Sequence, residues 1–184
     1  RLEFLDNDNI VDYKPKYTKL EFDNKNLPEK SRNIEELLED DDVIQNQDFA
    51  DMVAYLYTRG DRLFNLNNYY WTPSTYNKMN RRIIIPFYWN GNIVGYVGRS
   101  IDKTERLRYF GDIPFNYIFN TERIKPEHKY IFLVEGPFDA LAINGIATSG
   151  DKCSPSKVNW PNQQINYNNK EIIAISDKEK GGGV

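Results

Sequence analysis

The chain has 184 residues and a mass of 21.6 kDa, which allows one domain of ordinary size or two small ones. Charged residues make up 28% of the sequence and no apolar run approaches the ~20 residues of a membrane helix, so a membrane-spanning role is excluded. The single cysteine, Cys153, excludes an internal disulfide, and no His/Cys cluster offers four zinc ligands. These features predict an intracellular protein. Because the sequence starts without Met or a secretory pattern, we expect it to be part of a longer protein.

Charge is distributed unevenly along the chain. Residues 1–60 contain 8 Lys and Arg against 15 Asp and Glu, whereas the remaining residues contain 16 against 12. Most of the basic excess lies between Arg62 and Lys129. Such asymmetry suits a polyanionic partner, although solvated surface charge is the alternative explanation.

The N-terminal quarter is acidic and has little periodicity. Residues 1–30 predict an extended arm. Apolar residues within 34–38 predict a short amphipathic helix, and the acidic run 39–42 predicts a linker after it, since like charges repel. We therefore interpret residues 1–47 as an acidic arm or linker with a short helix.

A helix and a hairpin follow. Apolar residues recur at helical spacing over 48–58, with Asp48 as the expected N-cap and Gly60 as the stop. Further on, the apolar stretches 82–88 and 93–97 flank Asn90-Gly91, a pair that readily adopts the positive φ angles of a tight turn, and they predict an antiparallel β-hairpin. The tryptophans are expected to serve packing.

Two apolar runs near the C-terminus each end in acidic residues. The run 130–134 predicts a strand covered on both faces, and Pro137 suits the first turn of a helix that continues to Gly145. The run 172–175 predicts a second strand, which the long connection makes parallel to the first.

Parallel neighbours would bring the acids after both runs to one edge of the sheet, where open α/β sheets bind ligands. Glu135 follows the first run, and Asp177 and Glu179 follow the second. Oxygen ligands without His or Cys favour Mg²⁺ or Mn²⁺, and such ions serve phosphoryl or nucleotidyl transfer. Asp139, one helical turn after Glu135, could either bind the metal or hold the loop by capping nearby amides. Either acidic turn alone is more often an ordinary turn, but the pair is more specific.

The same residues resemble a known family. Segments 134–141 and 176–182 are similar to the two signatures of a Toprim domain, a fold of primases, topoisomerases and some nucleases. Upstream, segments 54–60, 82–87, 95–99 and 108–110 resemble the basic N-terminal subdomain of DnaG-type DNA primases, especially bacteriophage ones. The upstream half favours a primase over the other Toprim enzymes.

The resemblance implies an α/β fold in which a small basic N-terminal subdomain, 48–128, with a helix and an antiparallel hairpin, precedes a truncated Toprim domain, 129–184, with parallel strands. It also implies synthesis of RNA primers on single-stranded DNA from nucleoside triphosphates with Mg²⁺ or Mn²⁺, in the cytoplasm or a phage host's cytoplasm, with a replicative helicase as partner and no membrane.

The residue roles that the resemblance implies fall into three groups. The catalytic and metal-binding acids would be Glu135, Asp177 and Glu179, with Asp139 in support; the residues that hold template or triphosphate would be Arg81, Arg82, Arg99, Arg106, Arg108 and Tyr109; the glycines of the motifs would be Gly136 and Gly182.

Three features depart from the family pattern. Glu179 stands where Asp is usual, the chain stops at Val184 before later Toprim elements, and no zinc-ribbon cysteines precede the basic subdomain. Two alternatives therefore remain open: a metal-dependent Toprim nuclease, and a noncatalytic module that binds single strands or a replication partner through a degenerate Toprim domain.

Overall fold

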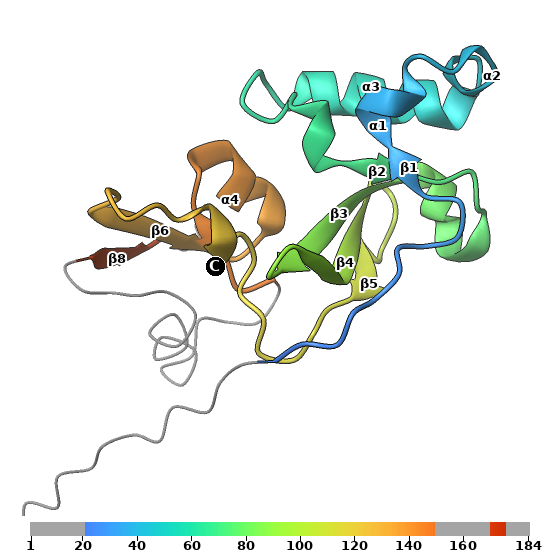
Figure 1. Cartoon of the computed structure of the whole chain (residues 1–184). Coiled ribbons are helices and arrows are strands. Elements are labelled where there is room, and N and C mark those ends of the chain that lie inside the picture. The colour runs from blue at the N-terminus through green and yellow to red at the C-terminus, as the bar shows by residue number, and fades with distance from the viewer. Residues whose placement is uncertain (1–20, 150–169, 176–184) are drawn as a thin grey trace, which may run out of the picture.

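The computed structural model describes residues 21–149 and 170–175, and in these residues it contains two β-sheets (Figure 1). The first is antiparallel, in the order β1-β2-β3-β4-β5, and the second is parallel, in the order β7-β6-β8. The mixed α/β class predicted from the sequence is confirmed. The strands of the first sheet are β1 (Arg32–Asn33), β2 (Tyr70–Trp71), β3 (Arg82–Trp89), β4 (Asn92–Ser100) and β5 (Tyr109–Asp112).

The predicted hairpin is the centre of the antiparallel sheet. Strands β3 and β4 pair from Arg82↔Ser100 to Trp89↔Asn92. Asn90 and Gly91, with φ angles of 50° and 76°, form the two-residue turn, as the sequence predicts. Residues 82–87 of β3 are all buried, which explains why this antiparallel strand reads as a continuous apolar run.

Three helices lie beyond one end of this sheet (Figure 1): α1 (Ile34–Leu37), α2 (Asp41–Ile44) and α3 (Gln47–Thr58). The linker predicted at 39–42 is wrong, because Asp40 caps α2 and the following two acids occupy its first turn, where the helix dipole favours negative charge. The N-cap of α3 is Asn46 rather than Asp48. Gly60, with a φ of 94°, follows the helix end as predicted.

The parallel sheet consists of β6 (Tyr130–Val134), β7 (Ile146–Ala147) and β8 (Glu171–Ala174). Helix α4 (Pro137–Ile143) follows β6, with Pro137 at its first position as predicted, and Asn144 ends the helix in the left-handed conformation one residue before Gly145. Short 3₁₀ helices span Leu66–Asn68, Tyr76–Arg81 and Thr121–Arg123.

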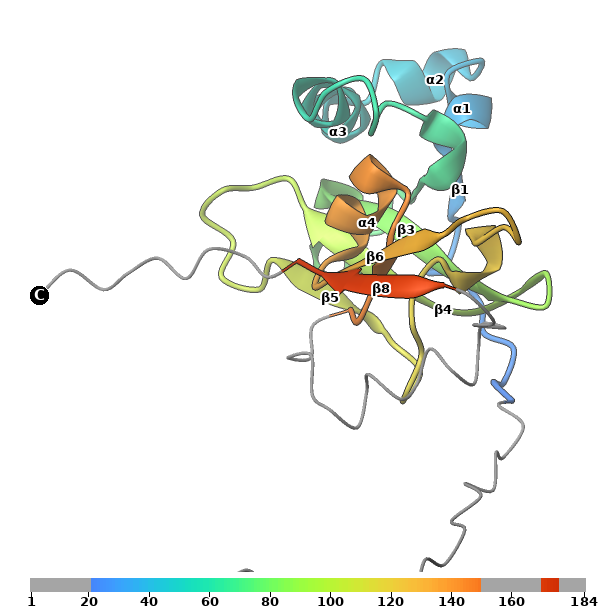
Figure 2. The same cartoon turned by 90° about the vertical axis from the view of Figure 1, so that its left-hand side faces the viewer.

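Strands β6 and β8 are parallel neighbours, which confirms the predicted arrangement of the two apolar runs (Figure 2). The register pairs Tyr130 with Glu171 and Leu133 with Ala174. At the start of β8, the Lys170 ammonium donates hydrogen bonds to the carbonyl oxygens of three residues that precede β6, namely Lys125, Pro126 and His128.

One hydrophobic core joins the helices, the antiparallel sheet and α4. It contains Phe49 of α3, Trp71 of β2, Phe87 of β3 and Phe138 of α4. Trp71 is buried and Trp89 packs against the core, so the packing role predicted for these tryptophans is confirmed, while Trp160 lies outside the described residues. None of the helices in the described ranges is long and apolar enough to cross a membrane.

Candidate active site

A cavity of about 410 Å³ brings residues of both sheets together. Strands β4 and β5 contribute to it from the antiparallel sheet, and the turn between β6 and α4 contributes from the parallel sheet. The lining residues are Arg59, Val97, Arg99, Tyr109, Ile113, Glu135, Gly136, Pro137, Asp139 and Ser149. Four residues singled out from the sequence for chemistry therefore line one space: Arg99, Tyr109, Glu135 and Asp139.

The acidic wall of the cavity is the turn from β6 into α4. Glu135 leaves the end of β6, and Asp139 lies in the first turn of α4; both are exposed. Gly136 separates strand from helix, and a Cβ atom at this position would lie 2.9 Å from an Asp139 carboxylate oxygen. The absence of a side chain at 136 thus leaves room for the Asp139 carboxylate to fold back over the turn.

The cationic wall is formed by Arg99 on β4. Its guanidinium donates to the hydroxyl groups of Tyr55 at 3.1 Å and Tyr109 at 2.5 Å. It also lies over two aromatic rings, 4.8 Å from the centre of Tyr109 and 5.5 Å from that of Phe138. Burial disfavours the charged form, but the hydrogen bonds to both tyrosines outweigh it and raise the pKa of Arg99. Arg99 is therefore a fixed positive charge beside the cavity.

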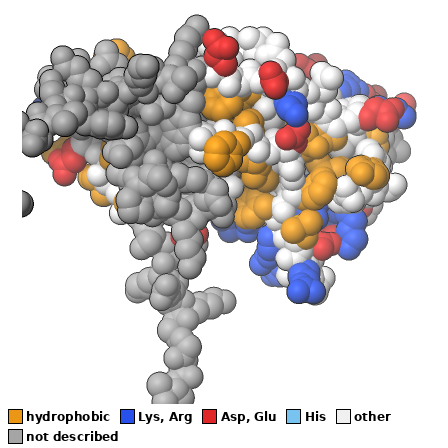
Figure 3. All heavy atoms as spheres, turned by 90° about the horizontal axis from the view of Figure 1, so that it is seen from below, with side chains coloured by type: hydrophobic (Ala, Val, Ile, Leu, Met, Phe, Trp, Pro, Cys, Tyr) orange, Lys and Arg blue, Asp and Glu red, His pale blue; other side chains and the backbone are white. Residues whose placement is uncertain are grey.

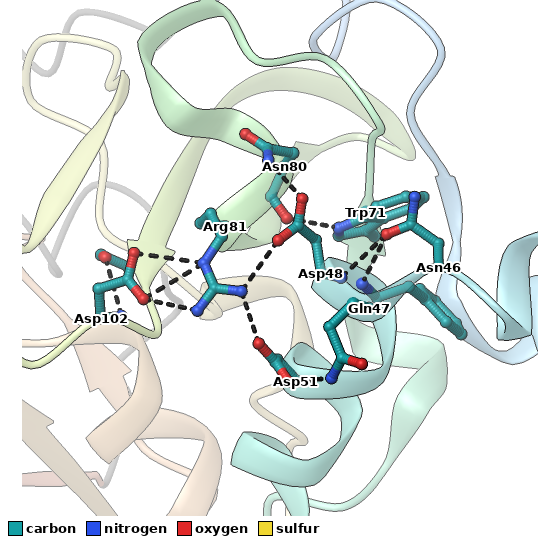
Figure 4. A network of polar contacts seen from close by, with 10 residues as sticks. Asn46, Gln47, Asp48, Asp51, Trp71, Asn80, Arg81 and Asp102 are labelled. Carbon is teal, nitrogen blue, oxygen red and sulfur yellow. Dashed lines mark hydrogen bonds and ion pairs between the residues drawn. The ribbon is translucent and has the colours of Figure 1, made fainter.

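Arg81 has a different role from the one predicted. Its guanidinium forms ion pairs with Asp48 at 2.9 Å, Asp51 at 2.7 Å and Asp102 at 2.7 Å (Figure 4). The hydrogen bonds to these acids, that to Asp102 first, raise the pKa of Arg81. The Arg81 guanidinium is thus neutralised within the fold and links α3 to the residues that follow β4. It therefore lacks the unpaired charge that a contact with template or triphosphate requires.

Arg82 is also unsuited to its predicted role. Its side chain is buried, with 2% of the residue exposed. The guanidinium donates to the carbonyl oxygens of Asn77, Gly98, Leu107 and Arg108. Arg82 therefore holds the segment between β4 and β5 in place and has no surface to offer a ligand. Arg106 and Arg108, by contrast, are exposed on that segment and form no ion pair among the described residues.

Several predicted site residues cannot be located. Asp177, Glu179 and Gly182 lie outside the described residues, and so does Cys153. Within the described ranges, no group of three or more His, Cys, Asp or Glu side chains could hold a metal ion. Glu135 and Asp139 supply two oxygen donors of the type that Mg²⁺ prefers. The described end of β8 lies at the same sheet edge, because the Ile175 amide donates to the Leu133 carbonyl.

Two polar residues of the cavity, Arg59 and Ser149, were not assigned a role from the sequence. Arg59 follows the last turn of α3, four positions after Tyr55, so both lie on one face of that helix. This spacing is a signal that the sequence does contain. Ser149 follows β7, and its buried hydroxyl has no hydrogen-bond partner among the described residues. Nothing in the sequence around Ser149 indicates this position.

Lys and Arg side chains are also exposed on another face of the molecule. Figure 3 shows a face on which hydrophobic side chains form a band, with Lys and Arg mostly along one border of it. Exposed aromatic and aliphatic residues of the described chain include Phe115, which is 86% exposed, and Ile113 at the cavity. Positive charge beside apolar surface is the combination that binds single-stranded nucleic acid.

Comparison with known proteins agrees with the resemblance seen in the motifs. A DNA primase of Mycoplasma pneumoniae is 28% identical over 119 residues, which are 58% of this chain and 19% of that protein. A DNA primase of Mycoplasma genitalium is 32% identical over 69 residues, which are 34% of this chain and 11% of that protein. This chain is similar to DnaG-type DNA primases. No family model matches it.

The fold of this chain is also similar to that of a primase. The crystal structure of the Aquifex aeolicus primase, with its zinc-binding and RNA polymerase domains, superimposes with a TM-score of 0.53 at 20% identity, over 73% of this chain and 44% of that one. The chain therefore has the fold of part of a DnaG-type primase. It spans a fifth or less of the length of the Mycoplasma primases that it matches.

Proposed function

We propose that this chain is part of the catalytic core of a DNA primase, which joins ribonucleotides into short primers on a single-stranded DNA template. The observation that carries the proposal is the cavity between the two sheets, where Glu135 and Asp139 line the same space as the positively charged Arg99. A site for nucleotidyl transfer needs both features: carboxylates for a divalent cation and a cation for phosphate.

Each wall of the cavity has a part in this reaction. Glu135 and Asp139, together with Asp177 and Glu179, would hold Mg²⁺ or Mn²⁺, which when bound neutralises phosphate charge and lowers the pKa of an attacking hydroxyl. Arg99 would contact the triphosphate, and its hydrogen bonds to Tyr55 and Tyr109 fix the guanidinium before a ligand arrives. The arrangement reduces the cost of ordering a long side chain during binding.

The template strand is assigned to the exposed residues near β5. Arg106 and Arg108 lie on the segment that leads into β5, and Arg59 lies at the cavity itself. Their contacts with phosphate would be independent of sequence and would weaken as salt concentration rises. A contact with a replicative helicase, and the basic and Toprim subdomains with boundaries at 48–128 and 129–184, remain predictions from the resemblance to primases.

Replacing Glu135 tests the proposal directly. In the full-length protein that contains this chain, we expect Glu135→Gln to abolish primer synthesis on single-stranded DNA, because it removes a charged ligand from the acidic wall. Glu127→Gln is the matched control, since Glu127 is an exposed acid outside the cavity. Undiminished synthesis by Glu135→Gln would contradict the assignment.

The same preparation separates primer synthesis from the two alternatives. Labelled single-stranded DNA is incubated with Mg²⁺, with and without ribonucleoside triphosphates. Extension products that need the triphosphates support a primase, whereas cleavage without them indicates a nuclease. Titration with Mn²⁺ addresses the noncatalytic alternative, because a degenerate site binds no metal even at millimolar concentration.

A further inference from the structure

Helix α3 carries apolar side chains beyond its buried face, and the core covers these further side chains only in part. Phe49, Met52 and Leu56 lie on the buried face, each no more than 1% exposed. The other face lines an open groove with residues at positions i, i+3, i+4, i+7 and i+8, namely Ala50, Val53, Ala54, Tyr57 and Thr58. Such spacing makes a continuous stripe along a helix. A helix in a monomeric domain needs one apolar stripe, so the second one requires an explanation.

The remaining walls of the groove are also apolar. Leu38 follows α1, Ile44 ends α2, and Phe64 lies beyond the end of α3. Leu38 and Ile44 are each 42% exposed, Phe64 is 37% exposed, and Tyr57 is 72% exposed. The rings of Tyr57 and Phe64 meet edge to face at 5.7 Å, so that end of the groove has a defined aromatic wall. The described residues leave this surface open to solvent.

The rim of the groove is acidic at the end formed by Leu38 and Ile44, whereas Arg59 and Arg62 lie close to Thr58 and Phe64 in the sequence. Between positions 33 and 58 the sequence contains eight Asp and Glu and no Lys or Arg. Asp40, Asp48 and Asp51 pair with arginines of the fold. The other five, Glu35, Glu36, Glu39, Asp41 and Asp42, are exposed and form no ion pair with any described residue. Residues 39–42 connect Leu38 to Ile44, so uncompensated negative charge lies directly beside two apolar walls.

The shape of the groove favours a helix as its occupant. It is built from side chains of helices and of Phe64, and it presents no strand edge that could pair with an extended segment. Ala50 and Ala54, one turn apart on its floor, let another backbone come close, and the hydroxyl of Thr58 already donates to the Tyr55 carbonyl. The 12 residues of α3 span about 18 Å, enough to contact about three turns of a partner helix.

We propose that this groove is a docking site for an amphipathic helix of a partner protein, with an apolar stripe bordered by Lys and Arg. The apolar stripe supplies the buried area, and the basic border complements the unpaired acids of the rim. The groove shares no residue with the cavity at Arg99 and Glu135, so this inference does not depend on the proposed function.

A pair of synthetic peptides tests the charge and the shape together. Both are about 18 residues long and carry Leu at the same helical spacing, but one has Lys and the other Glu beside the stripe. Fluorescence anisotropy with the full chain should show the Lys peptide binding at least ~10-fold more tightly than the Glu peptide at low salt, with a smaller difference at high salt.

Variants of the chain locate the binding. Ile44→Ser should weaken binding of the Lys peptide, whereas Tyr76→Ser is the matched control, because Tyr76 is exposed and lies outside the groove. Exchanging Glu39 and Asp42 together for Lys should reverse the preference between the two peptides. Ile44 and the two acids are exposed, so we expect these variants to fold. Circular dichroism verifies this for each variant.

Three results would overturn the proposal. Equal affinity for both peptides would mean that the groove binds apolar surface without regard to the charge beside it. Binding of the Lys peptide that Ile44→Ser leaves unchanged would place it elsewhere on the molecule. Sedimentation of the wild-type chain as a dimer that Ile44→Ser converts to a monomer would make a second copy of the chain the occupant.

Discussion

Two arginines of the antiparallel sheet illustrate how surroundings decide the use of a charge. Arg81 is enclosed by three carboxylates, from Asp48, Asp51 and Asp102. Arg99 is held by two neutral hydroxyls and two aromatic rings, and no described carboxylate pairs with it. Both side chains are fixed, but only Arg99 retains an uncompensated charge beside a cavity. An arginine held by tyrosines is prepared for an anion, whereas one held by acids is part of the scaffold.

Among the substitutions at the two arginines and their partners, removing Arg99 should have the largest effect on function. We expect Arg99→Ala to reduce primer synthesis by about 100-fold, because the proposed contact between a fixed positive charge and the triphosphate is lost. The melting temperature should change little, since Arg99 neutralises no acid of the fold. Steady-state synthesis and thermal unfolding measure the two effects. A large loss of stability with little loss of synthesis would mean that Arg99, like Arg81, is part of the scaffold.

Removing Arg81 should act mainly on stability. Arg81→Ala leaves three carboxylates close together without a counter-charge, and we expect the melting temperature to fall by about 5 °C. Lys25→Ala is the control: the pair between Lys25 and Asp112 at 3.0 Å lies at the surface, with side chains 44% and 48% exposed, and an ion pair contributes little there. Calorimetry of both variants measures the two melting temperatures. Equal decreases would show that the three-acid network contributes no more to stability than a surface ion pair does.

The acid dependence of stability should separate Arg81→Ala from the wild type. Hydrogen bonds from Arg81 and then Gln47 hold the pKa of Asp51 below its ordinary value. The stability from this pairing is present above a pH of about 4 and is lost as the pH falls through the lowered pKa. The difference in melting temperature between wild type and variant should therefore narrow as the pH falls below about 4. A constant difference would mean that Arg81 acts through packing alone.

The smallest effect is expected at the support of Arg99. Tyr109→Phe keeps the ring beneath the guanidinium but removes one hydroxyl acceptor, while Tyr55 continues to accept its hydrogen bond. We expect synthesis to fall by about 5-fold, mainly through a higher KM for the nucleoside triphosphate. Tyr117→Phe is a suitable control, because its hydroxyl bonds the Tyr88 carbonyl instead. An unchanged KM would mean that Tyr55 alone positions Arg99.

The sequence predicted the elements that depend on local pattern. The hairpin at Asn90-Gly91 and the strand before Glu135 follow from residue types within a few positions of each other. The N-cap of α3 was misplaced because Asn46 and Asp48 are both good capping residues. Asp48 instead pairs with Arg81, 33 residues away, and a short-range sequence pattern does not indicate such a contact.

The site was predictable in part for the same reason. Glu135 and Asp139 belong to one turn, so their proximity could be inferred, and Arg99 and Tyr109 were expected to serve together. Arg81 and Arg82 are neighbours of the same type in the same basic stretch, yet one meets three acids and the other meets carbonyl oxygens. Composition records that a segment is basic, but only the packing of β3 against β4 and α3 determines which guanidinium remains available.

Lys170 connects the start of β8 to the segment that precedes β6. By binding three carbonyl oxygens ahead of β6, its ammonium pins the entry of β8 against the neighbouring strand. A slip of one position along this pair would turn every side chain of β8 to the opposite face. A change at Lys170, which does not line the cavity at Arg99 and Glu135, could thus alter the register of β8 beside β6, and an inventory of ligand contacts at that cavity would overlook it.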